Sequence, residues 1–163
     1  MHVRRVLAAV VALGFLAAGR AEAQPKPLKS AAEIMGALSA GRQVRAVLHY
    51  RDMALVDEKG APQKSPDAVG GMDLATFEHF AAGAVGNKEG YFVASHTQLI
   101  RHPRYGYVLN YVKVSVYDSG MVKIVAQYLS PMTYEVRMDE TFTTTVADGT
   151  TKGAANFSAI EAP

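Results

Sequence analysis

The residues that could do chemistry gather in one stretch, HTQLIRHPRYGYVLNY, at residues 96–111. It holds two histidines, two arginines and three tyrosines, which are side chains that bind metal ions, move protons or recognise anions. The RHPRYG segment within it favours a turn between two strands. His96 then lies on a strand and His102 at its tip, about 20 Å apart at roughly 3.3 Å per residue. Two histidines on one zinc ion must lie much closer, so the sequence predicts no metal pair here and no cofactor.

Enzyme signatures elsewhere in the chain are sparse. No serine lies in a G-x-S-x-G motif, and no glycine-rich loop links a strand to a helix as phosphate binding requires. Glu135 and Asp139 flank Arg137 on one face of an expected strand, which is typical of a solvated charge row. The leading hypothesis is therefore a non-enzymatic binding or interaction protein. The alternative is a small hydrolase that the fold assembles, with His96 or His79 as its base.

The first 23 residues are typical of a cleaved signal peptide. A basic start precedes the apolar run VLAAVVALGFLAAG, and AEA at residues 21–23 places small residues where signal peptidase cuts. The apolar run has fourteen residues, whereas a membrane-spanning helix needs about 20. The sequence predicts cleavage after Ala23 and a periplasmic or secreted mature protein without a membrane span. That mature chain, residues 24–163, has the length of one domain.

Removing the leader changes the charge balance. The whole chain has 17 Lys and Arg against 15 Asp and Glu. The leader contains three of the basic residues and one of the acidic residues, which leaves 14 of each. A mature chain without net charge gives no electrostatic reason to expect nucleic acid or an anionic membrane as partner. The chain has no cysteine, which excludes disulfides and thiolate zinc sites. We expect a protein or small-molecule partner outside the cytoplasm.

The elements that must position these residues begin with one helix and one strand. In SAAEIMGALSAG, Ser30 and Glu33 have the spacing of a capping box, and Gly41 is a typical stop signal. RQVRAVLHY, residues 42–50, alternates apolar and polar residues as a strand does. Residues 57–71 are rich in proline, glycine and charge and predict a long loop. Residues 72–86 fit either a helix or a strand.

Two hairpins follow. GYFVASHTQLI and YGYVLNYVKV are the expected arms of the first, around RHPRYG. In the second, a three-residue loop at residues 118–120 makes one face wholly apolar, whereas either two-residue loop sets a valine opposite Lys123. The three-residue loop also places Gly120 where a left-handed residue is needed. The facing pairs are then Val116 and Val122, Val114 and Ile124, and Val112 and Ala126.

The last strands complete the expected sheet. Residues 133–146 alternate almost without fault. The residues expected inward are Tyr134, Val136, Met138, Phe142 and Val146. Glu140 is the inward exception, and we expect a bend or bulge there. GAANFSAI adds a final strand. The sequence thus predicts a mostly β (α+β) fold, with a single antiparallel sheet or partly closed barrel and one N-terminal helix.

The non-valine face of the second hairpin carries the candidate binding residues. They are Tyr107, Tyr111, Lys113, Lys123 and Gln127. The derived register sets Tyr111 opposite Gln127, and Ser115 opposite Lys123. Aromatic rings with polar tips and two ammonium groups are typical of a surface for an anionic or sugar-like ligand, or for a protein partner. An ordinary solvent-exposed face accounts for the same pattern, since tyrosine is a strong strand former.

The chain resembles the VirK-like family of small exported bacterial proteins. The likeness lies in the helix, glycine stop and strand of SAAEIMGALSAGRQVRAVLHY, in GGM, and in the hairpin VSVYDSGMVKIVAQYLSPMTYEV. The resemblance implies export and a link to host association or virulence, and it supplies no activity and no catalytic residues. The family often has cysteines after the first strand and near the C-terminus. Here Met53 and residues 143–145 occupy those regions, so no disulfide-dependent property carries over.

Overall fold

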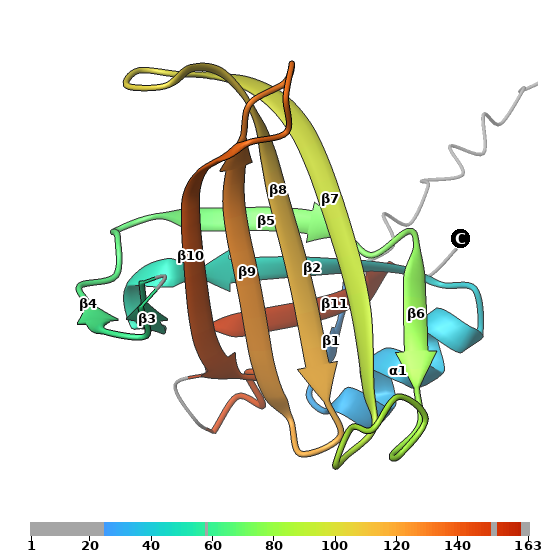
Figure 1. The fold of residues 1–163 in the computed structure, drawn as a ribbon. Coiled ribbons are helices and arrows are strands. Elements are labelled where there is room, and N and C mark those ends of the chain that lie inside the picture. Colours follow the sequence, from blue (N-terminus) through green and yellow to red (C-terminus); the bar gives the residue numbers. More distant parts are fainter. Residues whose placement is uncertain (1–24, 58, 151–152, 161–163) are drawn as a thin grey trace, which may run out of the picture.

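The computed structural model describes residues 25–57, 59–150 and 153–160, and within them the chain forms two sheets and one α-helix (Figure 1). The small sheet contains, in spatial order, β1 (Lys26–Leu28), β11 (Ala155–Ile160), β2 (Gln43–His49) and β5 (Val69–Asp73). The large sheet contains β4 (Pro62–Gln63), β3 (Ala54–Val56), β10 (Val136–Thr145), β9 (Met121–Leu129), β8 (Gly106–Tyr117), β7 (Tyr91–His102) and β6 (Phe77–Phe80). The predicted signal peptide at residues 1–23 lies outside the described residues.

The two sheets pack face to face with their strands crossing. In Figure 1 the strands of the large sheet run from top to bottom, and those of the small sheet run across behind them. The helix α1 (Ala31–Ser39) contacts β2 and β11. We call the face of the large sheet that meets the small sheet its inner face, and the opposite face its outer face. The long strands β7 to β10 extend past β5, so the small sheet covers only part of the inner face (Figure 1).

The mostly β fold with one N-terminal helix is confirmed, but the prediction of a single sheet or partly closed barrel is wrong. After β2 the chain passes through the 3-10 turn η1 (Tyr50–Asp52) and enters the large sheet at β3. It returns after β10, where an isolated parallel bridge pairs Val146 with Ala155. Alternation along a strand shows that one face is buried, but it does not show which sheet buries it. The pattern of the two sheets therefore looks like that of one.

The hydrophobic core fills the space between the two sheets and includes the buried face of α1. Alternating residues of β2 meet alternating residues of β8 and β9 there, as the strand pattern of residues 42–50 predicts. The large side chains that are at most 2% exposed include Ile34, Val44, Leu48, Phe92, Val114, Val116, Val122, Ile124 and Phe142. This burial of apolar surface is the main force that holds the sheets together, because the chain has no cysteine.

The predicted N-terminal cap of α1 at Ser30 is confirmed, but the Glu33 side chain accepts from the amide one residue before the cap. The Ser30 hydroxyl accepts a hydrogen bond from the Glu33 amide at 3.2 Å, and the Glu33 carboxylate accepts one from the Lys29 amide at 2.7 Å. The chain leaves the helix through Gly41, whose φ of 71° suits a residue without a Cβ atom. These two signals fix the two ends of α1 and lead the chain into β2.

The register of the second hairpin is also confirmed. Val116 lies opposite Val122, and Val114 lies opposite Ile124. Gly120 closes the three-residue loop with a φ of 84°, and its amide donates to the Tyr117 carbonyl at 2.8 Å. Because a shift of one residue would move every valine to the other face, this turn decides which side chains the outer face presents.

The strand β10 differs from its prediction at two points. The register shift lies between Val136 and Met138, and not at Glu140. Tyr134 and Val136 are 68% and 47% exposed, so their inward assignment is wrong. The physical reason is a turn before the strand, in which Tyr134 has a φ of 57° and donates its amide to the Ser130 carbonyl at 2.8 Å. Glu140 needs no bend, because it faces the part of the inner face that the small sheet leaves uncovered.

The structure shows the secondary structure of two segments that the sequence describes only loosely, residues 57–71 and 72–86. The segment 57–71, predicted as one long loop, contains the short strand β4 and the first residues of β5. Asp57 organises its turn by accepting hydrogen bonds from the amides of Lys59 and Ala61, each at 2.9 Å, and those bonds lower the pKa of the Asp57 carboxyl. The segment 72–86, which the sequence leaves open, forms the end of β5, then β6, then turns.

Candidate functional site

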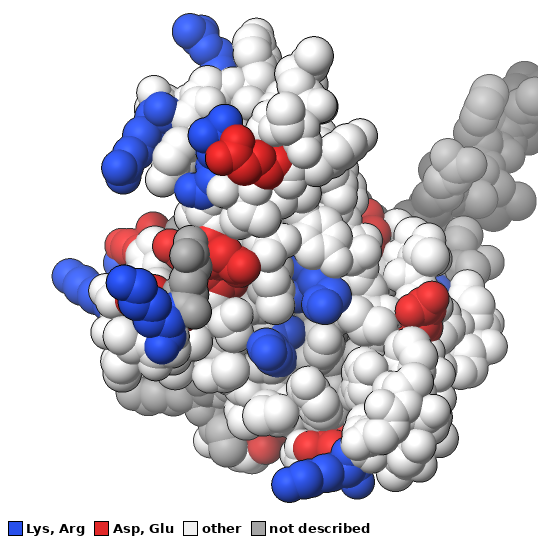
Figure 2. All heavy atoms as spheres, in the orientation of Figure 1, with Lys and Arg blue, Asp and Glu red and all other residues white. Residues whose placement is uncertain are grey.

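The outer face of the large sheet carries a groove of about 530 Å³ over β6, β7, β8 and β9. Figure 2 shows this face, with basic atoms in a hollow near its centre and uncharged atoms around them. The aromatic side chains that line the groove are Phe77, Phe80, Tyr91, Tyr111 and Tyr117. We call this hollow the outer groove.

Three of the five predicted binding residues line the outer groove, namely Tyr111, Lys113 and Lys123. The register that brings them together is the one expected: Lys113 lies opposite Val125, and Ser115 lies opposite Lys123. The two lysines are thus diagonal neighbours on adjacent strands, for which Cα atoms lie about 7 to 8 Å apart. Neither ammonium group has an acidic partner within 4.0 Å among the described residues.

The other two predicted residues lie outside the outer groove. The Gln127 side chain donates a hydrogen bond to the Asp139 carboxylate at 2.9 Å on the neighbouring strand β10. Tyr107 is 65% exposed near the start of β8, where it borders a separate hollow together with Ser130 and Pro131. Sequence reasoning placed both on the correct face but could not tell how far along the strands the groove extends.

The residues of β6 and β7 that line the outer groove were not predicted from the sequence. Phe80 of β6 stacks on Tyr91 of β7 with ring centroids 5.1 Å apart, and Tyr91 contacts Tyr117 of β8 at 5.5 Å. These rings come together because β6 pairs with β7, with Phe80 opposite Tyr91. The signal was the aromatic pair in TFEHF, residues 76–80, which becomes informative only once residues 72–86 are assigned to a strand.

The outer groove has the chemistry of an anion-binding surface. Two ammonium groups supply positive charge, and the hydroxyls of Ser95 and Ser115 can donate hydrogen bonds. One carboxylate, Glu78, also lines the groove, but it forms no ion pair with either lysine. The aromatic rings give an apolar body a surface to pack against. No histidine lines the groove, so it lacks the usual group for general base catalysis.

The hydrolase hypothesis gains no support from the positions of the histidines. It needs a histidine within hydrogen-bond reach of a hydroxyl or carboxylate in a cleft. In the ranges that the structure describes, no histidine side chain makes such a bond. His102 instead accepts hydrogen bonds at Nδ1 from the amides of Arg104 and Tyr105, at 3.1 and 3.3 Å. The same ranges contain no group of three or more His, Asp or Glu side chains that could hold a metal ion.

The predictions about the membrane and the leader differ in what the structure says of them. Among the described residues, no helix has the length and apolar character that crossing a membrane requires. The predicted leader and its cleavage after Ala23 lie outside these residues and stay predictions.

Comparisons with known proteins identify the family. A family model described as VirK protein matches residues 27–134, which is more than half of the chain. Among solved structures, the fold is similar to that of a VirK family protein from Legionella pneumophila, with a TM-score of 0.60 and 14% sequence identity. That similarity covers 81% of this chain and 98% of the other and concerns the fold alone. No match was found among the curated proteins. The chain belongs to the VirK family, as the sequence resemblance predicts.

Proposed function

We propose that this protein is an exported, non-enzymatic binding protein that holds an anionic molecule with an apolar body in the outer groove. The observation that carries the proposal is the pair Lys113 and Lys123, two ammonium groups without acidic partners between aromatic walls. Residues 1–23 support export to the periplasm or beyond the cell. The VirK resemblance adds a role in host association or virulence to the proposal.

The physical basis is the uncompensated charge of the two lysines. Diagonal neighbours of like charge on a sheet repel each other, and an anion between them replaces this repulsion by two attractions. The surrounding rings exclude part of the solvent, which strengthens those attractions relative to bulk water. Glu78 and the lysines lie in one groove without pairing, so an anionic ligand does not have to break an ion pair in order to bind.

The test uses 8-anilinonaphthalene-1-sulfonate, an anionic aromatic fluorophore, and its neutral relative N-phenyl-1-naphthylamine. We expect the wild-type protein to bind the sulfonate more tightly than the neutral compound. The double variant Lys113→Gln/Lys123→Gln should lose about tenfold in affinity for the sulfonate, because charged hydrogen bonds contribute about 1.5 to 3 kcal/mol. Lys26→Gln on β1 is the matched control, since Lys26 is exposed on the small sheet, and it should change nothing.

Two results would count against an anion-binding groove. One is equal affinity for the sulfonate and the neutral compound, which would indicate apolar adsorption only. The other is a double variant that binds the sulfonate as the wild type does. Export is tested separately by sequencing the N-terminus of the protein recovered outside the cytoplasm, which should begin at Gln24; an intact Met1 would contradict it.

A further inference from the structure

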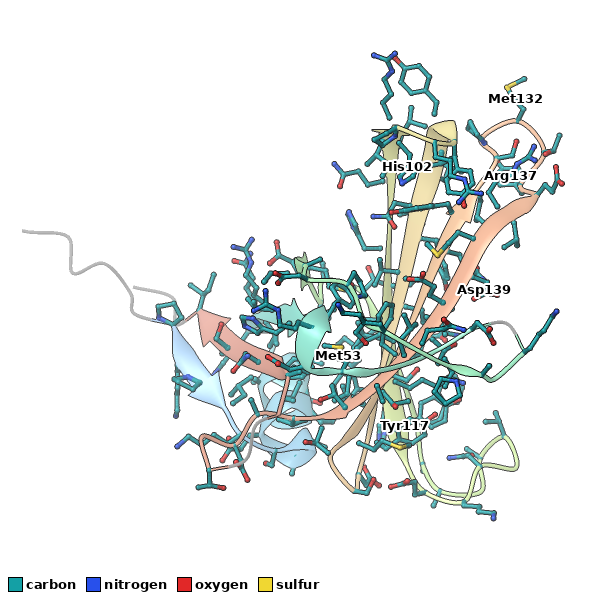
Figure 3. All side chains as sticks on the ribbon, turned by 90° about the vertical axis from the view of Figure 1, so that its left-hand side faces the viewer. Met53, His102, Tyr117, Met132, Arg137 and Asp139 are labelled. Carbon is teal, nitrogen blue, oxygen red and sulfur yellow. The ribbon has the colours of Figure 1, made fainter. Side chains whose placement is uncertain are left out.

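A second hollow, of about 450 Å³, lies on the inner face of the large sheet, on the opposite side from the outer groove. Its floor is formed by β8, β9 and β10 where they extend past the small sheet (Figure 1). Tyr50 of η1 and the segment at Pro66 and Ala68 border it on one side. The turn between β7 and β8, with His102 at its base, borders it on the other (Figure 3). We call this hollow the inner cavity.

The floor of the inner cavity contains one carboxylate, Glu140. This side chain is half-buried and lies on β10 opposite Ala126. It makes no hydrogen bond or ion pair with any described residue, and its burial raises the pKa of the carboxyl. Partial desolvation of a charge that has no partner in the protein costs folding free energy. Its position, inside a concave site and off the main core, is typical of a group that serves binding.

Aromatic rings surround this carboxylate in two groups. On one side, Tyr50 contacts Phe142 with ring centroids 4.8 Å apart. On the other side, His102 contacts both Tyr105 and Tyr128 at 4.9 Å. Ring faces carry partial negative charge, so both groups favour a cation between them. The walls and the floor of the inner cavity thus have the same electrostatic preference.

The hydroxyls of Tyr50 and Tyr128 are influenced by the charge of Glu140. Burial raises the pKa of Tyr50, and the neighbouring Tyr128 and Glu140 raise it further. Burial likewise raises the pKa of Tyr128, followed by the effects of Glu140 and Tyr105. Both hydroxyls therefore stay protonated and neutral near neutral pH, and the negative charge on the floor of the inner cavity is that of the Glu140 carboxylate. A positively charged ligand would compensate this charge, whereas an anionic ligand would be repelled by it.

One cationic side chain of the protein, Arg104, lines the inner cavity as well. Its guanidinium lies over the Tyr105 ring, 5.4 Å from the centroid, and forms no ion pair with Glu140. Arg104 is exposed, so it lies at the rim and leaves the carboxylate without a counter-ion. Its stacking shows that this aromatic wall accommodates a cation.

We propose that the inner cavity binds a small organic ammonium ion, with Glu140 as its counter-ion and the rings of Tyr50, Tyr128 and His102 as its walls. The volume of about 450 Å³ lies in the range of about 300 to 1,000 Å³ that is common for small-molecule sites. A neutral ligand could donate hydrogen bonds to the carboxylate, but it would not compensate the charge. This site is independent of the outer groove, because the two lie on opposite faces of the sheet.

The test compares benzylamine, which is charged at neutral pH, with benzyl alcohol, which has the same ring and no charge. Binding is followed by NMR titration of the full mature chain. We expect saturable binding of benzylamine at least about tenfold tighter than that of benzyl alcohol, with shifts at Tyr50, His102 and Tyr128. Glu140→Gln should weaken benzylamine binding by about tenfold or more and leave benzyl alcohol binding unchanged.

The matched control is Glu135→Gln, the same substitution at an exposed residue just before β10 that lines neither the outer groove nor the inner cavity, and it should leave benzylamine affinity within about twofold. A thermal melt verifies that Glu140→Gln folds. A second variant, Tyr128→Leu, removes one ring and should weaken benzylamine binding by several-fold while leaving Glu140 in place. Equal affinity for benzylamine and benzyl alcohol, or a folded Glu140→Gln protein that binds benzylamine as the wild type does, would overturn the proposal.

Discussion

The outer and inner faces of the large sheet use the same strands to present opposite charges. Lys113 lines the outer groove, whereas its neighbour Val112 lines the inner cavity. On β9, Val125 and Ala126 divide in the same way. Successive side chains of a strand point to opposite faces, so two ligand chemistries can be built into one hairpin without interfering. The turn at residues 118–120 sets the register of β8 and β9 and therefore decides which side chains line both sites.

The two faces also differ in what covers them. The outer face is open apart from the wall that β6 and β7 form beside the groove. The inner face is closed by the small sheet over Val114 and Ile124, which are both 0% exposed, and is accessible near Glu140. Along β8 and β9 the inner face thus changes from structural core to candidate site.

The largest effect should come from a charge placed on the covered part of the inner face. Val122 is 0% exposed, so Val122→Asp buries a carboxylate without a partner. We expect a loss of several kcal/mol, a large part of the about 5 to 15 kcal/mol that stabilises a typical domain. Lys123→Asp, one residue along and exposed, should change the free energy of unfolding by no more than about 0.5 kcal/mol. Urea denaturation measures both, and equal losses would mean that the outer face is buried too.

A smaller effect should separate two tyrosines of the outer face. Tyr111 lines the outer groove, whereas Tyr107 does not. Tyr111→Ala should weaken binding of the anilinonaphthalene sulfonate by about fivefold, since an aromatic contact contributes about 0.5 to 1.5 kcal/mol. Tyr107→Ala should leave the affinity within about twofold. Fluorescence titration decides between them, and a larger loss from Tyr107→Ala would move the site toward the start of β8.

A further prediction concerns Arg104, at the rim of the inner cavity. Its guanidinium stacks on Tyr105 and repels a ligand of like charge. We expect Arg104→Gln to raise benzylamine affinity by about twofold to fivefold and to leave sulfonate binding unchanged. Arg101→Gln is the control, because Arg101 is exposed on β7 and does not line the cavity. Weaker benzylamine binding in Arg104→Gln would show that the arginine helps to hold the ligand.

The smallest effect concerns stability and pH. Burial raises the pKa of folded Glu140 above its ordinary value of 4.5, so the folded state holds this proton more tightly than the unfolded state does. As pH rises from the ordinary value through the raised one, Glu140 therefore takes stability away from the fold. In the inner cavity, the titratable and charged groups that face it are Tyr50, His102, Arg104, Tyr105 and Tyr128. Glu140 also lines an adjoining hollow, whose charged side chains are Asp57, Lys59, Lys64, Arg137 and Asp139. These groups are present in the wild type and in Glu140→Gln alike.

The melting temperature of Glu140→Gln relative to the wild type should accordingly increase across that pH window and then stay constant. Thermal melts from about pH 4 to pH 7.5 measure the difference. A relative stability of Glu140→Gln that falls as pH rises would mean that the carboxylate has a stabilising partner in the folded protein.

Local signals in the sequence were sufficient for much of the fold. The N-terminal cap at Ser30 and the three-residue loop ending at Gly120 each have one favourable conformation, and both are confirmed. The position of Lys113 and Lys123 on a shared face follows from that loop alone. The division into two sheets did not follow, because it depends on the turn η1 and on which strands pair over long distances. Alternation carries no information about pairing partners.

The candidate sites show the same limit. The alternation along residues 133–146 predicts that Glu140 points inward and that the strand bends or bulges there, but the register shift lies between Val136 and Met138. Its environment comes from Tyr50, which precedes it by ninety residues, and from the turn at His102. The opening stretch at residues 96–111 therefore does contribute chemistry, through the contacts of His102 and Tyr105 with Tyr128 and not through a metal pair. Only the tertiary structure brings these segments together.

The most direct test of two independent sites with opposite charge preference is a crossed titration. The sulfonate and benzylamine are each titrated into Lys113→Gln/Lys123→Gln and into Glu140→Gln, with and without the other compound present. We expect Lys113→Gln/Lys123→Gln to lose about tenfold in affinity for the sulfonate only, and Glu140→Gln to lose about tenfold in affinity for benzylamine only. Neither ligand should displace the other. Loss of both ligands in either variant, or competition between them, would contradict the division of the sheet into two binding faces.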